Sequence, residues 1–110
     1  MYARIATFES TDPAADEKLM GQAMEIVEPI IRGMTGIQGH MELADQSSGK
    51  SLSISLFDSE ENAKAAETLF DEEMPKALGE IMQQFSGRRI SVERYKVFVD
   101  ERVPAGVVTG

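Results

Sequence analysis

The chain has 110 residues, a length typical of one domain. It contains no cysteine, which excludes a disulfide framework, a cysteine-ligated metal site and a thiol nucleophile. Its 19 Asp and Glu against 11 Lys and Arg give a formal charge of −8, which disfavours binding to nucleic acid and to anionic membranes. Because the sequence lacks both a signal-peptide pattern and an apolar run near the ~20 residues that span a bilayer, we expect a cytoplasmic protein.

The first predicted elements are a strand and a long helix. Residues 2–8 alternate in character, which is typical of a strand. Asp12 and Pro13 indicate a helix start, an N-cap acceptor followed by proline at the first helical position. Apolar residues then repeat at helical spacing, and Arg32-Gly33 predicts the end of the helix. Pro29 lies inside this pattern and is expected to kink or weaken the last turns of the helix.

Two strands joined by a polar turn are predicted next. The second strand covers about residues 37–45, and residues 45–50 form a polar turn of the hairpin type. The third strand, residues 51–57, alternates most clearly of all. Leu52, Ile54 and Leu56 share one of its faces, and three serines followed by Phe57 share the other.

The second half of the chain predicts a bent helix and a last strand. Residues 58–61 provide a serine cap with acidic residues in the first turn. Pro75 interrupts the helical spacing that follows, so we predict two segments with a bend near residues 74–75, ending at Gly87. The last strand covers about residues 89–99. Residues 100–110 are interpreted as a C-terminal tail or a dimer arm that packs on a partner.

The element order β-α-β-β-α-β predicts a single ferredoxin-like α+β domain over residues 1–99. Such a domain has a four-stranded antiparallel sheet with its helices on one face. The second face is not plainly polar, because it carries apolar residues among Ser, Gln and Arg; they are Tyr2, Ala6, Phe8, Ala44 and Phe57. A mixed face without a covering helix indicates a second copy of the sheet, so we expect a homodimer.

Three stretches resemble the antibiotic-biosynthesis-monooxygenase-like members of the dimeric α+β-barrel superfamily. Residues 36–43 (GIQGHMEL) are similar to the family's glycine-containing entry into the second strand, and residues 45–50 to its polar hairpin. Residues 53–63 (SISLFDSEENA) are similar to its third strand, where an aromatic residue precedes a capped acidic helix start. The resemblance implies a dimeric α+β barrel with a cavity between sheet and helices in each subunit.

The activities known in this family are of two kinds. Some members oxidise polycyclic phenols to quinones with oxygen and without metal or flavin; they carry an Asn four residues before a strand-three Trp, where this chain has Ser53 and Phe57. Others degrade haem and need an Asn on strand one, a Trp on strand three and a His on the second helix. This chain has no Trp, no Asn in its first strand and no His in residues 59–86. We therefore predict no haem and no other cofactor.

His40 and Glu42 are the candidate catalytic residues. They alternate on the second strand, so both side chains leave the same face of the sheet. A carboxylate beside an imidazole orients the ring and raises its basicity, which suits a general base. The alternative is a surface or interface histidine beside a solvated glutamate. Because His40 is the only histidine and the acidic run 71–73 lacks the spacing of a calcium loop, no metal site is predicted.

The candidate substrate-binding residues are Ser53, Ser55, Phe57 and Arg4. In a cavity the serine hydroxyls would orient a polar ligand while Phe57 supplies an apolar wall. The alternative is serine packing on a half-wet strand face or in a dimer interface. Arg4, together with Arg94 and Tyr95, would bind an anionic or phenolic substrate, or else form salt bridges with the chain's many carboxylates.

Two functional hypotheses follow. The first is a small-molecule-binding dimeric α+β-barrel protein that takes a small apolar or phenolic compound, with cofactor-independent oxygenation as the chemistry that the resemblance implies. The second is a non-catalytic protein of the same fold that serves dimerisation, ligand sensing or partner binding. A cavity with convergent polar groups would favour the first hypothesis, and a filled core would favour the second.

Overall fold

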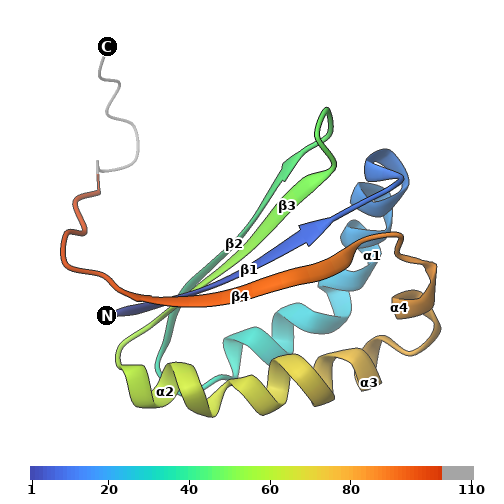
Figure 1. The fold of residues 1–110 in the computed structure, drawn as a ribbon. Helices are drawn as coiled ribbons and strands as arrows, with labels where there is room; N and C mark the ends of the chain where they lie inside the picture. The colour runs from blue at the N-terminus through green and yellow to red at the C-terminus, as the bar shows by residue number, and fades with distance from the viewer. Residues whose placement is uncertain (103–110) are drawn as a thin grey trace.

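A computed structural model of the chain describes residues 1–102 and shows an antiparallel sheet with the helices packed on one face (Figure 1). The strands are β1 (Tyr2–Glu9), β2 (Ile37–Asp45), β3 (Lys50–Phe57) and β4 (Arg88–Lys96). They lie in the order β2-β3-β1-β4, and each neighbouring pair is antiparallel. The predicted ferredoxin-like α+β fold is therefore confirmed.

The first helix, α1 (Pro13–Arg32), forms where the sequence predicts it. The Asp12 carboxylate caps its first turn by accepting a hydrogen bond of 3.3 Å from the backbone N–H of Ala15. The helix continues through Pro29 to Arg32. It ends at Gly33, whose N–H donates to the Pro29 carbonyl at 3.1 Å.

Asp16, in the first turns of α1, joins this helix to the segment before β4. Its carboxylate accepts hydrogen bonds from the Ser86 backbone N–H at 2.9 Å and from the Ser86 hydroxyl at 2.8 Å. The Ser10 hydroxyl at the end of β1 donates to it as well. Burial opposes ionisation of this carboxyl, but the hydrogen bonds from Ser10 and Ser86 outweigh it and hold the pKa of Asp16 below its ordinary value.

The second helical region has more segments than the two, with a bend near residues 74–75, that the sequence predicts. It consists of α2 (Glu60–Ala65), a π-helix η1 (Leu69–Glu73), α3 (Met74–Leu78) and α4 (Glu80–Gln84). Pro75 has no backbone N–H to give to a preceding carbonyl, and just before it the chain winds more widely, with the Met74 N–H bonding to the Leu69 carbonyl. Gly79, at a φ of 56°, separates α3 from α4.

The helices cover the face of the sheet that carries the serines and Phe57. Phe57 is fully buried in the core, and Arg4 contacts the Phe70 ring in the helical layer. The prediction that this mixed face is the uncovered one is therefore wrong. Alternation separates the two faces of a strand, but it does not say which one a helix covers when both carry apolar side chains.

The open face of the sheet is largely apolar, and it includes the Leu52, Ile54 and Leu56 face of the third strand. Seven large apolar or aromatic residues lie on it: Ile5, Met41, Leu43, Leu52, Ile54, Leu56 and Tyr95. Met41, Leu43 and Tyr95 are 49%, 43% and 50% exposed. We call this set the open-face patch.

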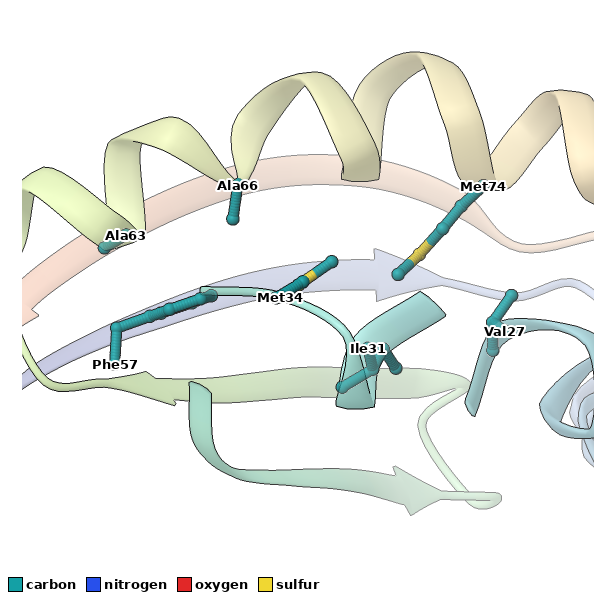
Figure 2. Packing of buried hydrophobic residues seen from close by; sticks show 7 residues of the cluster. All are labelled: Val27, Ile31, Met34, Phe57, Ala63, Ala66 and Met74. Atoms are coloured by element: carbon teal, nitrogen blue, oxygen red, sulfur yellow. The ribbon is translucent and has the colours of Figure 1, made fainter. Parts of the chain in front are cut away.

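The hydrophobic core lies between the sheet and the helices (Figure 2). Its buried members are Val27, Ile31, Met34, Phe57, Ala63, Ala66 and Met74. The small side chains of Ala63 and Ala66 let the helical layer approach the ring of Phe57 closely. Complete burial of a side chain of this size stabilises the fold by about 1.5–3 kcal/mol.

The last strand is shorter than predicted, since β4 ends at Lys96 and not at residue 99. Lys96 lies opposite Tyr2, the first residue of β1, so the partner strand stops there. The Val97 N–H still donates to the Met1 carbonyl at 2.9 Å, after which Phe98 and Val99 are 89% and 67% exposed. Most of the predicted tail or arm, from residue 103 onward, lies outside the described residues.

Candidate functional site

A row of polar side chains crosses the sheet beneath the helices. The strand register places His40 of β2, Ser55 of β3, Arg4 of β1 and Arg94 of β4 side by side on the covered face. Ser55 is fully buried and Arg4 is 2% exposed. Because burying polar groups costs free energy unless they are hydrogen-bonded, such a row in the interior marks a candidate site. We call it the polar row.

At one end of the polar row, His40 is hydrogen-bonded through both ring nitrogens. Its Nδ1 lies 2.8 Å from the Ser55 Oγ, and its Nε2 lies 2.7 Å from the Glu42 Oε1. The Ser53 hydroxyl donates to the same Glu42 oxygen at 2.9 Å. Because a carboxylate only accepts, Nε2 of the neutral ring carries the proton and Nδ1 accepts from Ser55. The arrangement is a hydroxyl–imidazole–carboxylate chain.

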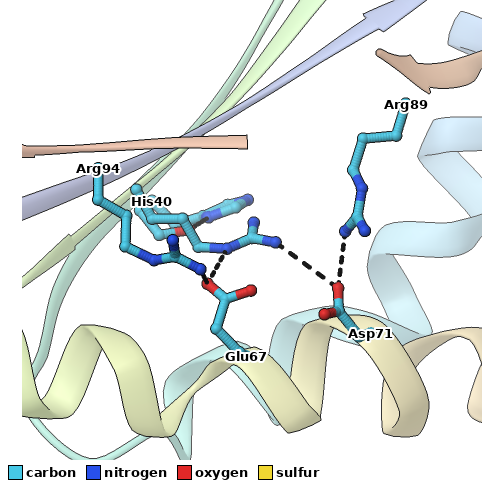
Figure 3. Close-up of polar contacts among 7 residues, drawn as sticks. His40, Glu67, Asp71, Arg89 and Arg94 are labelled. Carbon is cyan, nitrogen blue, oxygen red and sulfur yellow. Dashed lines mark hydrogen bonds and ion pairs between the residues drawn. The ribbon is translucent and has the colours of Figure 1, made fainter. Parts of the chain in front are cut away.

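At the other end, three arginines converge on two carboxylates of the helical layer (Figure 3). Arg4 Nε donates to Glu67 Oε1 at 2.8 Å, and Arg94 Nη2 lies 2.7 Å from the same oxygen. Arg89 Nη1 donates to Asp71 Oδ1 at 2.7 Å. We call these five residues the arginine cluster.

Arg4 is the central member of the arginine cluster. Its guanidinium carbon lies 3.9 Å from the centroid of the Phe70 ring, a cation–π contact. Its Nη2 is 4.0 Å from the Asp71 Oδ1 and has no hydrogen-bond partner, although the atom is buried. A buried donor without an acceptor costs on the order of 1–3 kcal/mol, so this atom is a point of unused binding capacity.

The electrostatics of the cluster favour the ionised form of Asp71. The hydrogen bond from Arg89, together with the charges of Arg89, Arg4 and Arg94, holds the pKa of Asp71 below its ordinary value against a smaller opposing effect of burial. Asp71 and Phe70 lie within the π-helix η1, and Glu67 lies just before it. Single-turn π segments inside helices are frequent at functional sites.

The structure brings most of the predicted site residues together. His40, Glu42, Ser53 and Ser55 form one hydrogen-bonded group, and Arg4 lies next to Ser55 in the polar row. Phe57 shares their face but belongs to the hydrophobic core. Tyr95 lies on the opposite face, 50% exposed, with its hydroxyl donating to Glu93. It is therefore separated from Arg4 and Arg94 by the sheet.

The sequence did not predict Glu67 or Arg89 as site residues. Asp71 was considered only as part of an acidic run that lacks the spacing of a calcium loop. A signal was present, since Glu67 and Asp71 are four residues apart and so share a face of a helical segment. Arg4 lies on the face of the sheet that this helical segment covers. Pairing the two nevertheless requires knowledge of which sheet face the helix covers.

Two of the hollows on the described part of the chain lie near the sheet and the helices. The larger of these two, about 380 Å³, lies beside the open-face patch and the segment after β4. It is lined by Met1, Gly39, His40, Met41, Ile54, Leu56, Val97, Asp100 and Arg102. The smaller, about 70 Å³, lies between the end of α1 and the region of α2. Neither hollow includes Ser53, Ser55 or Phe57 in its lining.

Residues 1–102 contain no group of three or more His, Cys, Asp or Glu side chains placed to hold a metal ion. None of the helices in this range is both long enough and apolar enough to cross a membrane.

The sequence matches no protein-family model and no curated protein. Among solved structures, a dimeric ferredoxin-like protein from an uncultured marine organism is 14% identical, with a TM-score of 0.73 over 93% of this chain and 98% of that chain. A haem-degrading protein from Mycobacterium tuberculosis, with two haems bound in its active site, is 14% identical, with a TM-score of 0.66 over 93% and 100% of the two chains.

A monooxygenase from Streptomyces coelicolor in complex with nanaomycin D is 17% identical, with a TM-score of 0.63 over 94% of this chain and 92% of that chain. Identities this low establish a shared fold and leave function open. The predicted resemblance is thus confirmed at the level of the fold. The chain has the ferredoxin-like α+β fold that antibiotic-biosynthesis-monooxygenase-like proteins share.

Proposed function

We propose first that the chain forms a homodimer through the open face of its sheet. The open-face patch supports this, because contiguous exposed apolar surface of this kind is typical of interaction sites. The similar ferredoxin-like protein from the marine organism is dimeric. Pairing of two equivalent faces about a two-fold axis is the commonest way to bury such a surface. Phe98 and Val99, exposed beside the same face, would add to the contact.

Leu43→Glu tests the dimer, since Leu43 is 43% exposed in a single chain and tolerates a charge there. We expect sedimentation analysis at micromolar concentration to give twice the 12.1 kDa of one chain for the unaltered protein and a single-chain mass for the variant. Gln22→Glu adds the same charge on the exposed surface of α1 and should leave the dimer intact. A single-chain mass for the unaltered protein would refute the proposal.

We propose further that the polar row is the binding site of a small, mostly planar phenolic molecule. The observation that carries the proposal is the burial of His40, Ser55 and Arg4 in one row under the helices. Polar groups that converge from several strands on one face offer the hydrogen-bonding partners that a bound ligand needs. Phe70 adds an aromatic surface beside the row.

In the proposed chemistry, His40 accepts a proton from the phenol. Ser55 lies between the imidazole and the middle of the row, so its hydroxyl would take the ligand's proton while giving its own to Nδ1 of His40. Glu42 holds the ring in place through Nε2. The resulting phenolate is electron-rich enough to react with oxygen directly. A phenolic anthrone would then lose both hydrogens of its CH₂ group, one oxygen atom forming the new ketone and the other leaving as water.

His40 supplies a direct test of binding. It is the only histidine, so its imidazole gives a single set of proton NMR resonances. We expect 2-naphthol to shift these resonances in a saturable way. A spectrum that does not change up to the solubility limit of 2-naphthol would refute binding at the polar row.

Turnover is tested with 1,8-dihydroxyanthrone and dissolved oxygen. We expect one oxygen consumed for each anthraquinone formed, and a rate about 100-fold lower in His40→Gln, the scale of general-base catalysis. Gln22→Glu should retain the full rate. A rate in the unaltered protein no higher than in buffer would refute oxygenation.

A second candidate function is ligand sensing or partner binding without chemistry. It is favoured by the fact that both ring nitrogens of His40 already have partners within the chain. The same two experiments separate the candidates. Saturable binding of 2-naphthol without anthrone oxidation supports the sensing function, and binding with oxidation supports the enzyme.

A further inference from the structure

The hollow of about 380 Å³ lies on the open side of the sheet, where the chain leaves β4. Apolar side chains of two neighbouring strands line one side of it, Met41 of β2 and Ile54 and Leu56 of β3. The segment after β4 lines another side, and Figure 1 shows this segment running away from the helices. The volume falls within the range of about 300–1,000 Å³ that is typical of small-molecule sites.

Gly39 is the reason why space is left between these side chains. It lies on the open face of β2 opposite Leu56, two residues before Met41, and it has no side chain of its own. Its backbone φ is not positive, so other residues adopt the same conformation without strain. A Cβ added there would lie 3.6 Å from the Leu56 Cδ1, an ordinary contact distance. The hollow therefore corresponds to a missing side chain in an otherwise apolar surface.

The two charged side chains that line the hollow are paired with each other. Arg102 donates from Nε to the Asp100 Oδ1 at 2.9 Å and from Nη2 to the Asp100 Oδ2 at 3.2 Å. This bond engages both oxygens of the carboxylate. A charged ligand would therefore meet no unpaired side-chain charge in the lining. Because burying an unpaired charge among apolar groups is costly, the lining selects for an uncharged ligand.

We infer that this hollow binds a small, uncharged, apolar molecule. Met41 suits the role, because the flexible thioether side chain adapts to ligands of different shapes. The inference goes beyond both proposed functions, since the hollow lies on the open face and the side chains of the polar row lie on the covered face. A second copy seated on the open-face patch would cover the bound molecule, because Met41, Ile54 and Leu56 belong to that patch as well.

The test compares two fluorescent probes that share one ring system. N-phenyl-1-naphthylamine is uncharged, and 8-anilinonaphthalene-1-sulfonate carries a negative charge. We expect the uncharged probe to give a saturable rise in fluorescence and to bind about tenfold or more tightly than the sulfonate. Equal or tighter binding of the sulfonate would overturn the assignment of an uncharged ligand, and no saturable binding of the uncharged probe would overturn the site.

Gly39→Val fills the hollow without removing an existing side chain. Valine is favoured in strands, and its methyl groups would occupy the space between Met41 and Leu56. We expect the variant to stay folded by circular dichroism and to bind N-phenyl-1-naphthylamine about tenfold or more weakly than the unaltered protein. Gly21→Ala adds a side chain on the exposed surface of α1 and should keep the full affinity. Unchanged affinity in Gly39→Val would overturn the inference.

A pair of glutamate substitutions keeps the test decisive if Gly39→Val does not fold. Met41→Glu places a carboxylate in the lining of the hollow, whereas Leu43→Glu places one on the same face of β2 outside the lining. The two residues are 49% and 43% exposed, so both variants should fold. We expect Leu43→Glu to bind N-phenyl-1-naphthylamine about tenfold or more tightly than Met41→Glu.

Two results with these variants would overturn the inference. Equal affinities in Met41→Glu and Leu43→Glu would mean that the probe binds to exposed apolar surface in general. Binding to Leu43→Glu but not to the unaltered protein would mean that a second copy fills the hollow in the dimer, which leaves no room for a ligand.

Discussion

Replacement of Phe57 by alanine tests which face of the sheet the helices cover. The ring is fully buried in the core, and removing it leaves a cavity beside Met34 and Ala63. Phe→Ala changes at such sites cost about 3–5 kcal/mol. With an unfolding entropy of about 2.1 cal/mol/K for each of 110 residues, this corresponds to a fall in Tm of about 13–22 °C. Phe98→Ala is the matched control, because Phe98 is 89% exposed and its loss should change stability by less than about 0.5 kcal/mol.

The assay is thermal and urea unfolding followed by circular dichroism, with both variants at one protein concentration because a dimer's stability depends on it. Under conditions where Phe57→Ala remains folded, we also expect weaker binding of 2-naphthol, since the ring shares a face with the polar row. Similar stability losses in Phe57→Ala and Phe98→Ala would show that Phe57 does not lie under the helices. The assignment of the two sheet faces would then be wrong.

Three further outcomes are expected. Ser53→Ala removes one hydrogen bond to Glu42 and should change stability by no more than about 1 kcal/mol in urea melts, while altering the affinity for 2-naphthol; unchanged affinity would separate Ser53 from the site. The depressed pKa of Asp16 means that its stabilising effect is present above the unfolded-state pKa, near 4, and is lost as pH falls through the folded-state pKa. Asp16→Asn should therefore lower stability at pH 7 and flatten its acid dependence, and urea midpoints at several pH values would contradict this if both proteins lost stability in parallel. Haem titration should give no sharp Soret band at micromolar concentration, because no histidine lies in residues 59–86; a band that disappeared in His40→Gln would identify an unexpected ligand.

The candidate site was only half visible in the sequence. The alternation of His40 with Glu42, and of Ser53 with Ser55, was enough to predict that each pair shares a face. The hydrogen bonds that join these pairs depend on the register between β2 and β3, which places His40 opposite Ser55. The bulge between Ile37 and Gly39 shifts that register, and the pattern of a single strand does not predict such a bulge.

The arginine cluster shows why the other half was hidden. Arg4 and Arg94 come from strands that are distant in sequence but adjacent in the sheet, and Glu67 comes from the helical layer. The ion-pair partners of these charged side chains are set by the packing of the helical layer on the sheet. Local spacing therefore allowed both a salt bridge and a substrate contact for Arg4, and the packed structure shows the salt bridge together with one nitrogen left over.

Local patterns were enough to predict the order of the elements, the cap of α1 at Asp12 and the strand alternation. Each of these depends on side chains within one turn of a helix or a few residues of a strand. Two features depend on tertiary packing. The serine face lies under the helices while the Leu and Ile face stays open, and the second helical region is divided into four segments. Both faces of β3 are compatible with a strand. Which face is covered depends on the free energy of burying it against helices formed by distant parts of the chain.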